Sequence, residues 1–396
     1  MSRKDRWLLP EGIEEILPSE ARTLEGMRRR VLDLFDSWGY ELVMPPMIEY
    51  LDSLLTGVGR DLDLQTFKVT DQLSGRLMGI RPDITPQAAR IDAHYLKRQA
   101  PLRLCYVSPV LHTRPDPIAG SREPLQLGAE LFGHAGPESD GEILRLMVGT
   151  LRLVGIEDVH IDLGHIGVFR GLTADAALSD EDEADLLDAL QAKSGTDLAT
   201  LLEGSPIDDE RKRMFMALLK LNGGPEILVE SRRQLKAAPP PALKALDNLE
   251  AVAKVVQATV SELPLYFDLA EVTGYRYYTG VVFSAFVPAY GSAVAHGGRY
   301  DGIGKAFGRA RPATGFGADL RLLLKRSPAT GPNRHGILAP YDGDSDLRAE
   351  ITRLRDTGER VVVRLPDVDA TAEEMGCDRE LVPRDRGWAI VKTNSK

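Results

Sequence analysis

The sequence predicts an α+β fold: a mixed, mainly antiparallel sheet with helices, a helical insertion and a small C-terminal α/β domain. Three observations lead to this prediction. Strand-like runs separated by loops and an occasional helix occupy residues 40–132 and recur after residue 265. Ala/Leu-rich helical patterns dominate from about residue 173 to residue 257. Strand-like and helical patterns alternate over residues 336–396.

Two domains follow from these patterns, since 396 residues are enough for two or three. We expect a core at residues 1–326 that contains the helical insertion, and a small C-terminal domain at residues 336–396. The stretch SPATGPNRH at 327–335 has the composition of a linker.

The first predicted helix spans residues 19–38, where apolar side chains recur at helical spacing. Ser19 is its candidate N-cap, and Gly39 ends it. A second cap, Ser179, precedes an acidic first turn in the helical insertion, which three consecutive prolines at 239–241 interrupt. Helices are also predicted at 320–325 and 346–357. The predicted strands are 40–44, 66–70, 76–80, 103–107, 125–132, 266–269, 281–286, 292–296, 336–339, 361–365 and 388–391.

Composition excludes several classes of protein. No window approaches 18 uninterrupted apolar residues, and the N-terminus lacks a secretory apolar region, so we expect a cytoplasmic protein without a membrane span. The two cysteines, Cys105 and Cys377, are far apart and favour a reducing compartment. The net charge of −10 argues mildly against a nucleic-acid-binding protein. No motif indicates a metal site or a bound cofactor.

Polar side chains stand out on the strand-like runs. Gln126 and Glu130 lie four residues apart in an apolar run and therefore share one face of a strand. Asp83 follows another strand, and the pairs Tyr277–Tyr278 and Tyr300–Asp301 follow glycines. One interpretation is that Glu130 forms an ion pair with an arginine and has only a structural role. The other is a polar pocket for an ammonium-bearing ligand such as an amino acid.

The order of several motifs resembles that of class II aminoacyl-tRNA synthetases, and within that class histidyl-tRNA synthetase. The first is Leu9-Pro10-Glu11-Gly12, followed by the helix that ends in Trp38-Gly39-Tyr40 and by Pro45-Pro46. The others are RPDIT at 81–85, QLGAELFG at 126–133, GYRYY at 274–278 and GGRYDG at 297–302. They resemble the RPEGT, QLGxExFG, GLDYY and GGRYDG motifs of that family and span residues 9–325. The resemblance implies a class II synthetase-like core.

Three departures fall where the synthetase family binds ATP. His112 occupies the position of the motif-two arginine, Thr273 that of the arginine before GLDYY, and Leu322 that of the motif-three arginine. Arg321 lies one position away, which redirects its side chain. Adenylation needs cations placed against the transferring phosphate, so their loss predicts no activation chemistry.

A histidine pocket without activation chemistry resembles the regulatory subunit family of ATP phosphoribosyltransferase. DLGHIGVF at 162–169 and the YYTG at 277–280 also resemble that family. Residues 331–396 carry 11 Lys and Arg against 13 Asp and Glu, which gives no basic stripe for a tRNA. The implied chain is not an enzyme and binds no tRNA. Two alternatives stay open: an active histidyl-tRNA synthetase, and a free-standing synthetase-like binding module.

What the resemblance implies about ligands and partners is specific. The effector is histidine and the partner is the short-form catalytic subunit of ATP phosphoribosyltransferase, in histidine biosynthesis. A homodimer formed through the sheet domain would assemble into a hetero-octamer. Asp83 would hold the α-ammonium group, with Glu130 as a second candidate, while Gln126 and the tyrosines would line the imidazole. The implied histidine-binding residues are Asp83, Thr85, Gln126, Glu130, Tyr277, Tyr278 and Tyr300.

Overall fold

The computed structural model describes residues 7–56, 60–115, 120–275, 277–288, 291–327, 335–385 and 387–393. The chain forms two compact units, Met1–Ala329 and Thr330–Lys396. Most of the predicted linker at 327–335 lies outside the described residues.

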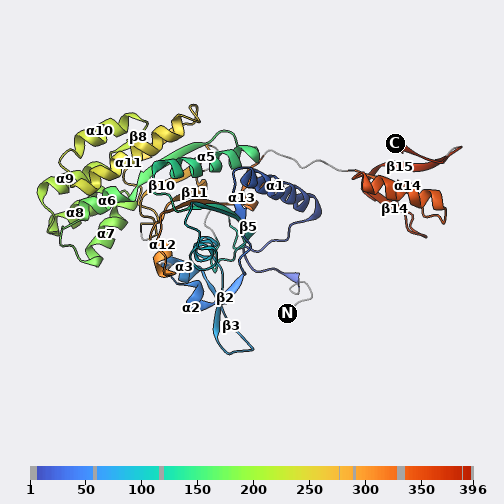
Figure 1. The fold of residues 1–396 in the computed structure, drawn as a ribbon, viewed down its shortest axis with the longest axis horizontal. Helices are drawn as coiled ribbons and strands as arrows, with labels where there is room; N and C mark the ends of the chain where they lie inside the picture. Colours follow the sequence, from blue (N-terminus) through green and yellow to red (C-terminus); the bar gives the residue numbers. More distant parts are fainter. Residues whose placement is uncertain are drawn as a thin grey trace. The chain divides into compact units, whose positions relative to one another are not determined.

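A nine-stranded sheet organises the first unit (Figure 1). The pairs β1–β5 and β7–β9 are parallel and the others antiparallel, so the predicted mainly antiparallel sheet is confirmed. In spatial order its strands are β1 (Glu41–Leu42), β5 (Leu102–Pro109), β6 (Leu125–Phe132), β12 (Ala313–Asp319), β11 (Ala293–Arg299), β10 (Val281–Phe286), β7 (His160–His165), β9 (Leu265–Asp268) and β8 (Asn222–Gly223).

Helices α1 (Pro18–Ser37), α5 (Pro137–Leu153) and α13 (Leu320–Arg326) pack beside this sheet. The apolar stripe of α1, formed by Leu24, Met27, Val31 and Phe35, is buried, as its periodicity predicts. The predicted N-cap is wrong: Leu17 is the N-cap and Ser19 lies inside the helix. Pro18 has its φ fixed near the helical value and needs no N–H there, which starts the helix one residue earlier.

The segment that follows β7 in the sequence forms a layer of helices, which contributes many of the buried side chains of the main apolar core. Ser179 caps its α7 helix in a capping box with Asp182, which confirms that prediction. The prolines at 239–241 stand at the start of α11 rather than inside a helix. The layer is not wholly helical, because β8 lies within it and joins the sheet edge. Its helices are α6 (Ile166–Thr173), α7 (Asp180–Gln191), α8 (Gly195–Gly204), α9 (Asp209–Leu218), α10 (Glu226–Gln234) and α11 (Pro240–Gln257).

A small three-stranded sheet follows β1 along the chain, in the order β2-β4-β3. The predicted hairpin is confirmed as β3 and β4. The strands are β2 (Ile48–Tyr50), β3 (Phe67–Thr70) and β4 (Leu77–Ile80), with the short helices α2 (Leu51–Leu54), α3 (Arg60–Gln65), α4 (Thr85–Arg90), the π-helix η2 (Ile91–Leu96) and α12 (Ile303–Ala306) nearby in the same unit.

The second unit is a four-stranded sheet in the order β14-β13-β15-β16 with one helix, α14 (Ser345–Asp356). Its strands β13 (Gly336–Ala339), β14 (Val361–Val363) and β16 (Gly387–Lys392) were predicted, whereas β15 (Cys377–Arg384) was not. β15 contains Asp, Glu and Pro, residues that are depleted from strands, which concealed it. Across the described ranges, we find no helix with the length and apolar character needed to cross a membrane.

Candidate functional site

The loop between β4 and α4 carries Asp83 and Thr85, and the buried Arg81 fixes its position. The Arg81 guanidinium donates to the carbonyl of Pro45 over 2.6 Å and to that of Pro109 over 3.0 Å. These bonds tie the loop to the segment after β1 and to the end of β5. Buried guanidinium groups need such acceptors, so Arg81 acts as a clamp for the loop.

Asp83 and Gln126 hold each other in place. Asp83 Oδ1 accepts hydrogen bonds from the Gln126 side-chain amide at 2.7 Å and from the Thr85 backbone at 3.0 Å. The other end of Gln126 accepts from the Ile84 backbone at 2.9 Å. The structure therefore brings the loop and β6 together through side chains singled out in the sequence.

Glu130 lies deeper on the same face of β6 and is 1% exposed. Its Oε1 lies 2.8 Å from the Tyr106 hydroxyl, and its Oε2 is hydrogen-bonded to Tyr300. Among the described residues no arginine forms an ion pair with Glu130, and the buried Arg299 pairs with Asp140 instead, so the scaffold ion pair with Glu130 is not found there. Burial raises the pKa of Glu130 to about 8, although the hydrogen bonds from Tyr300 and Tyr106 oppose the rise.

Glycines make room for this carboxyl. Gly315 stands opposite Glu130 in the ladder between β12 and β6, and a Cβ there would lie 1.7 Å from Glu130 Oε2. Gly128 stands opposite Tyr106, and a Cβ there would lie 2.4 Å from the tyrosine hydroxyl. The side chains of Glu130 and Tyr106 therefore lie over the backbone of a glycine rather than over a neighbouring side chain.

The GGRYDG motif places Tyr300. The buried Arg299 bonds to Asp140 at 3.0 Å, and Asp301 Oδ1 accepts from the Ala313 backbone at 2.9 Å. The Tyr300 backbone donates to the Ala313 carbonyl at 2.8 Å, which fixes the residue between two anchored neighbours. The motif thus serves mainly to aim one tyrosine at Glu130.

Tyr277 and Tyr278 complete the cluster. Gly274 begins their turn with φ +71°, and its carbonyl accepts from both tyrosine backbones at 2.8 Å. The Tyr277 ring stacks on Tyr300 with centroids 5.2 Å apart. The buried Tyr277 hydroxyl has no hydrogen-bond partner among the described residues. Burial raises the pKa of Tyr277, and the nearby Thr85 side chain opposes the rise. A buried hydroxyl without a partner is a group that a ligand can satisfy.

The sequence prediction missed Tyr106, which bridges Glu130 and Thr85 from β5. It sits in a strand whose other residues are mostly apolar, so its hydroxyl gave no polar signal. The pairing of an aromatic residue with Gly128 across two strands is the signal that could have revealed it. The structure brings together all seven predicted histidine-binding residues with Tyr106 as an eighth member.

The DLGHIGVF segment has a structural role outside this cluster. His165 caps α6, since its Nδ1 accepts from the Gly167 backbone at 3.0 Å. Its Nε2 lies 3.2 Å from Asn248. Burial lowers the pKa of His165 to about 4, so the ring is neutral, as an N-cap acceptor must be.

The three positions at which the synthetase resemblance expects arginines carry other side chains. His112 Nε2 lies 2.9 Å from the Pro82 carbonyl, beside the Asp83 loop. Thr273 is exposed, and its backbone donates to Glu271 at 2.8 Å. Leu322 lies in the first turn of α13. None of the three offers a cation to a phosphate.

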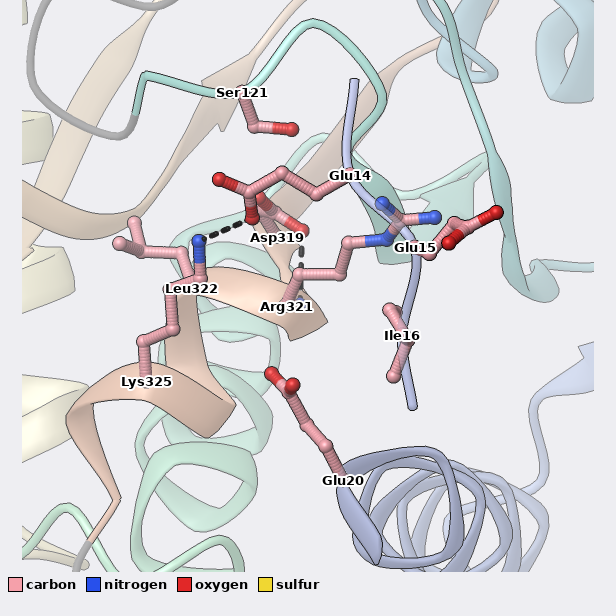
Figure 2. A pocket seen from close by; sticks show the side chains of 9 residues that line it. All are labelled: Glu14, Glu15, Ile16, Glu20, Ser121, Asp319, Arg321, Leu322 and Lys325. Carbon is pink, nitrogen blue, oxygen red and sulfur yellow. Dashed lines mark hydrogen bonds and ion pairs between the residues drawn. The ribbon is translucent and has the colours of Figure 1, made fainter. Parts of the chain in front are cut away.

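Figure 2 shows the pocket around Leu322, between α13, the N-terminal segment and the loop before β6. The Arg321 guanidinium pairs with Glu123 at 3.2 Å, and Lys325 pairs with Glu14 at 3.0 Å. Four carboxyl groups line the pocket against these two cations: Glu14, Glu15, Glu20 and Asp319. An anionic triphosphate would be repelled there, and Arg321 is already engaged. The part of the chain that the structure describes contains no cluster of three His, Cys, Asp or Glu side chains suited to a metal ion.

Two family models match the chain. The model described as histidyl-tRNA synthetase matches residues 12–323, and the model of the ATP phosphoribosyltransferase subunit HisZ C-terminal domain matches residues 334–391. An ATP phosphoribosyltransferase regulatory subunit from Alkalilimnicola ehrlichii is 55% identical over 394 residues, which cover 99% of this chain and 98% of the relative.

Solved structures agree. One from Bacillus halodurans, described as an ATP phosphoribosyltransferase regulatory subunit/histidyl-tRNA synthetase, has a TM-score of 0.81 and 29% identity, covering 94% of this chain and 98% of its own. The histidyl-tRNA synthetase from Nostoc sp. PCC 7120 has a TM-score of 0.78 at 18% identity, covering 95% and 91%, and shows the fold alone. The predicted class II synthetase-like fold is confirmed.

Proposed function

Because the chain belongs to the family of ATP phosphoribosyltransferase regulatory subunits, we propose that it binds histidine in the Asp83–Glu130 pocket and conveys that binding to a catalytic partner. The chain is a regulatory subunit and not an enzyme. The partner is the short-form catalytic subunit of ATP phosphoribosyltransferase, whose activity requires this chain and falls when histidine binds. The setting is cytoplasmic histidine biosynthesis.

One observation carries the choice of ligand. The cluster combines a carboxyl group in a hydrogen-bonded loop, Asp83, with a second carboxyl, Glu130, enclosed by tyrosines. An α-ammonium group fits the Asp83 and Gln126 end, where a charged acceptor is already oriented. A flat ring with polar nitrogens fits the tyrosine end, where aromatic faces and hydroxyl groups meet. Histidine carries both groups.

Regulation requires that histidine bind one state of the assembly better than another. A coupling free energy of roughly 1–3 kcal/mol would change the partner's activity several-fold or more. The Asp83 loop can transmit this coupling, because Arg81 ties it to the segments after β1 and at the end of β5. A ligand that draws Asp83 inward would therefore pull on residues outside the pocket.

A homodimer within a hetero-octamer is part of the proposal, and the three-stranded sheet supports the dimer. The paired strand residues on one face of that sheet are all apolar, although the guanidinium groups of Arg76 and Arg122 lie over the rings of Tyr50 and Phe67. Gly79 on the other face packs toward Leu51 and Leu54 of α2. Ile48 and Tyr50 on the apolar face are 41% and 37% exposed. The face consists of Ile48, Tyr50, Phe67, Val69, Met78 and Ile80. An apolar sheet face of this kind fits a second copy of the chain.

The C-terminal unit supports the absence of tRNA binding. Residues 331–396 have more acidic than basic side chains, with 13 against 11, so they offer no excess of cations to a phosphate backbone. The acid-rich pocket of Figure 2 likewise opposes ATP binding, which adenylation would require.

The test mixes the purified chain with the short-form catalytic subunit. We expect the two to co-elute from a size-exclusion column at micromolar concentration, and the chain to raise phosphoribosyltransferase activity several-fold. Histidine should then lower that activity. Separate elution with no change in rate would refute the proposed partnership, and ATP–pyrophosphate exchange dependent on histidine would refute the non-catalytic role.

A further inference from the structure

A chain of oxygen atoms runs through the pocket from Asp83 to Tyr300. Thr85 Oγ1 lies 3.1 Å from Asp83 Oδ1 and 3.0 Å from the Tyr106 hydroxyl. That hydroxyl lies 2.8 Å from Glu130 Oε1, and the Tyr300 hydroxyl meets Glu130 Oε2. Four oxygen–oxygen contacts therefore link five side chains, and each contact needs one proton to be a hydrogen bond.

The hydroxyl groups cannot supply all four protons. Thr85, Tyr106 and Tyr300 carry one each, which gives three. Asp83 cannot supply the fourth at Oδ1, because this oxygen already accepts N–H bonds from the Thr85 backbone and from Gln126. Glu130 is the remaining source. A proton on its Oε1 donates to Tyr106, Tyr106 donates to Thr85, Thr85 donates to Asp83, and Tyr300 donates to Oε2.

The surroundings of Glu130 favour this assignment. Its side chain is buried, and within the part of the chain that the structure describes, the groups that face it are Tyr106 from β5, Tyr300 after β11, Asp83 and Thr85 from the loop before α4, and Tyr277 and Tyr278 from the turn before β10. β12 contributes Gly315, which has no side chain. None of these groups is a cation, and the charge of Asp83 disfavours a second negative charge nearby.

We propose that Glu130 is a carboxylic acid in the ligand-free chain, and that its proton makes the pocket a hydrogen-bond donor which selects a neutral imidazole over an imidazolium. The inference rests on the proposed function, since it takes histidine as the ligand. It also moves Glu130 from the α-ammonium group, where the resemblance offered it as a second candidate, to the ring. When histidine binds, the Glu130 O–H turns from Tyr106 to the lone pair of a ring nitrogen, so no proton enters or leaves the complex.

The pH dependence of binding follows. Between the imidazole's own pKa, about 6.5, and the pKa of about 8 at Glu130, histidine binds with no proton exchange. Above that range Glu130 must first take up a proton, so affinity falls up to tenfold per pH unit. Below it the free imidazolium must lose a proton, and affinity falls again.

The first measurement concerns the ligand-free full-length chain. Infrared difference titration of the wild type against Glu130→Gln should show one carboxylic acid at pH 7 that ionises near pH 8 and is missing from the variant. The matched control, Glu123→Gln, removes an ion-paired carboxylate and should leave that signal in place. A Glu130 carboxyl already ionised at pH 7 would overturn the inference.

The second measurement needs only the wild type, so it holds even if Glu130→Gln fails to fold. Calorimetric titration with histidine at pH 7.2, in two buffers of different ionisation enthalpy, should give the same apparent enthalpy. A triazole analogue of histidine, whose ring stays neutral, should bind within tenfold of histidine. Release of about one proton, or rejection of the triazole by a hundredfold, would overturn the selection of a neutral ring.

The two measurements separate the inference from the function beneath it. An ionised Glu130 together with ordinary histidine binding would refute this inference and leave the proposed function standing. No histidine binding to the chain or to its complex with the catalytic subunit would refute the proposed ligand, and the selection of imidazole with it.

Discussion

Two parts of the synthetase-like core differ in what fills them: the Asp83–Glu130 cluster, proposed above as the amino-acid end, and the pocket around Leu322, which the synthetase resemblance implies is the phosphate end. At the amino-acid end, Asp83, Gln126 and Glu130 belong to one continuous hydrogen-bond network that is oriented before any ligand arrives. At the phosphate end, around Leu322, an aliphatic side chain and four carboxyl groups stand where polyphosphate binding needs cations. Under the proposed function, the difference means that one fold keeps a recognition site while losing the electrostatics for chemistry, because the two depend on different side chains.

The largest effect should come from filling the space beside Glu130. Gly315→Ala places a methyl group 1.7 Å from Glu130 Oε2 and 2.8 Å from the Ala129 carbonyl, so carboxyl and strand must both move. We expect loss of histidine binding and of about 3 kcal/mol of stability, the upper range for overpacking. Thermal unfolding and calorimetry measure both.

Gly317→Ala is the matched control on the same strand, because its methyl group would have no heavy atom nearer than 3.7 Å. It should leave stability within about 0.5 kcal/mol and histidine binding within twofold. Equal damage from the two variants would show that β12 tolerates no side chain, and that the space beside Glu130 is not special.

A second effect concerns stability against pH. Burial raises the pKa of Glu130 to about 8, so the folded chain holds a proton that the unfolded chain loses at its ordinary pKa near 4.5. The stabilisation is fully present below pH 4.5 and is lost as pH rises through 8. We expect this group to remove about 2–3 kcal/mol between pH 5.5 and 7.5.

Urea unfolding at a series of pH values measures that slope. The contribution is the difference between the wild type and Glu130→Gln, since every other titrating group is common to both chains. Parallel stability curves for the two chains would contradict a raised pKa at this position.

A third, smaller effect concerns the response to histidine. Glu130→Gln keeps the shape of the side chain and can still donate to Tyr106 and accept from Tyr300, but an amide N–H is a weaker hydrogen-bond donor to a ring nitrogen than a carboxylic acid O–H. Inhibition of the reconstituted complex should need at least tenfold more histidine, about 1.4 kcal/mol. Unchanged inhibition would remove Glu130 from the site, and Glu123→Gln at the phosphate end should change inhibition by less than twofold.

The smallest effect is expected at the phosphate end itself. Leu322→Arg restores the residue type that the synthetase motif has there, but places it among Glu14, Glu15, Glu20 and Asp319. The new guanidinium should pair with these carboxylates, leaving ATP affinity weaker than millimolar and histidine inhibition unchanged within twofold. Micromolar ATP binding by this variant would show that a single arginine was all the pocket lacked.

The sequence predicted elements well where periodicity and local chemistry agree. The helix at Pro18–Ser37 and the hairpin of β3 and β4 are such cases, although Pro18 rather than Ser19 sets the start of the helix. Helix α5 was not predicted, even though Pro137 at its first turn and acidic Glu138 and Asp140 are start signals that could have revealed it.

The residues of the candidate site likewise include some that the sequence could predict and some that it could not. Gln126 and Glu130 could be placed on one face because strand geometry alternates by two residues. The scaffold pairing of Glu130 with an arginine could not be excluded from sequence, since it depends on which strands become neighbours. The same is true of Tyr106, whose hydroxyl reaches Glu130 only because β5 and β6 pair in the register that sets Tyr106 opposite Gly128.

The most direct test of the account titrates histidine and Mg–ATP separately into the same preparation of the isolated chain. We expect histidine to saturate one site per chain, since the network at Asp83 and Glu130 is complete without a partner, and Mg–ATP to give no saturable signal up to millimolar concentration. Saturable Mg–ATP binding, or an absence of histidine binding, would contradict the claim that this chain keeps the amino-acid end of the pocket and has lost the phosphate end.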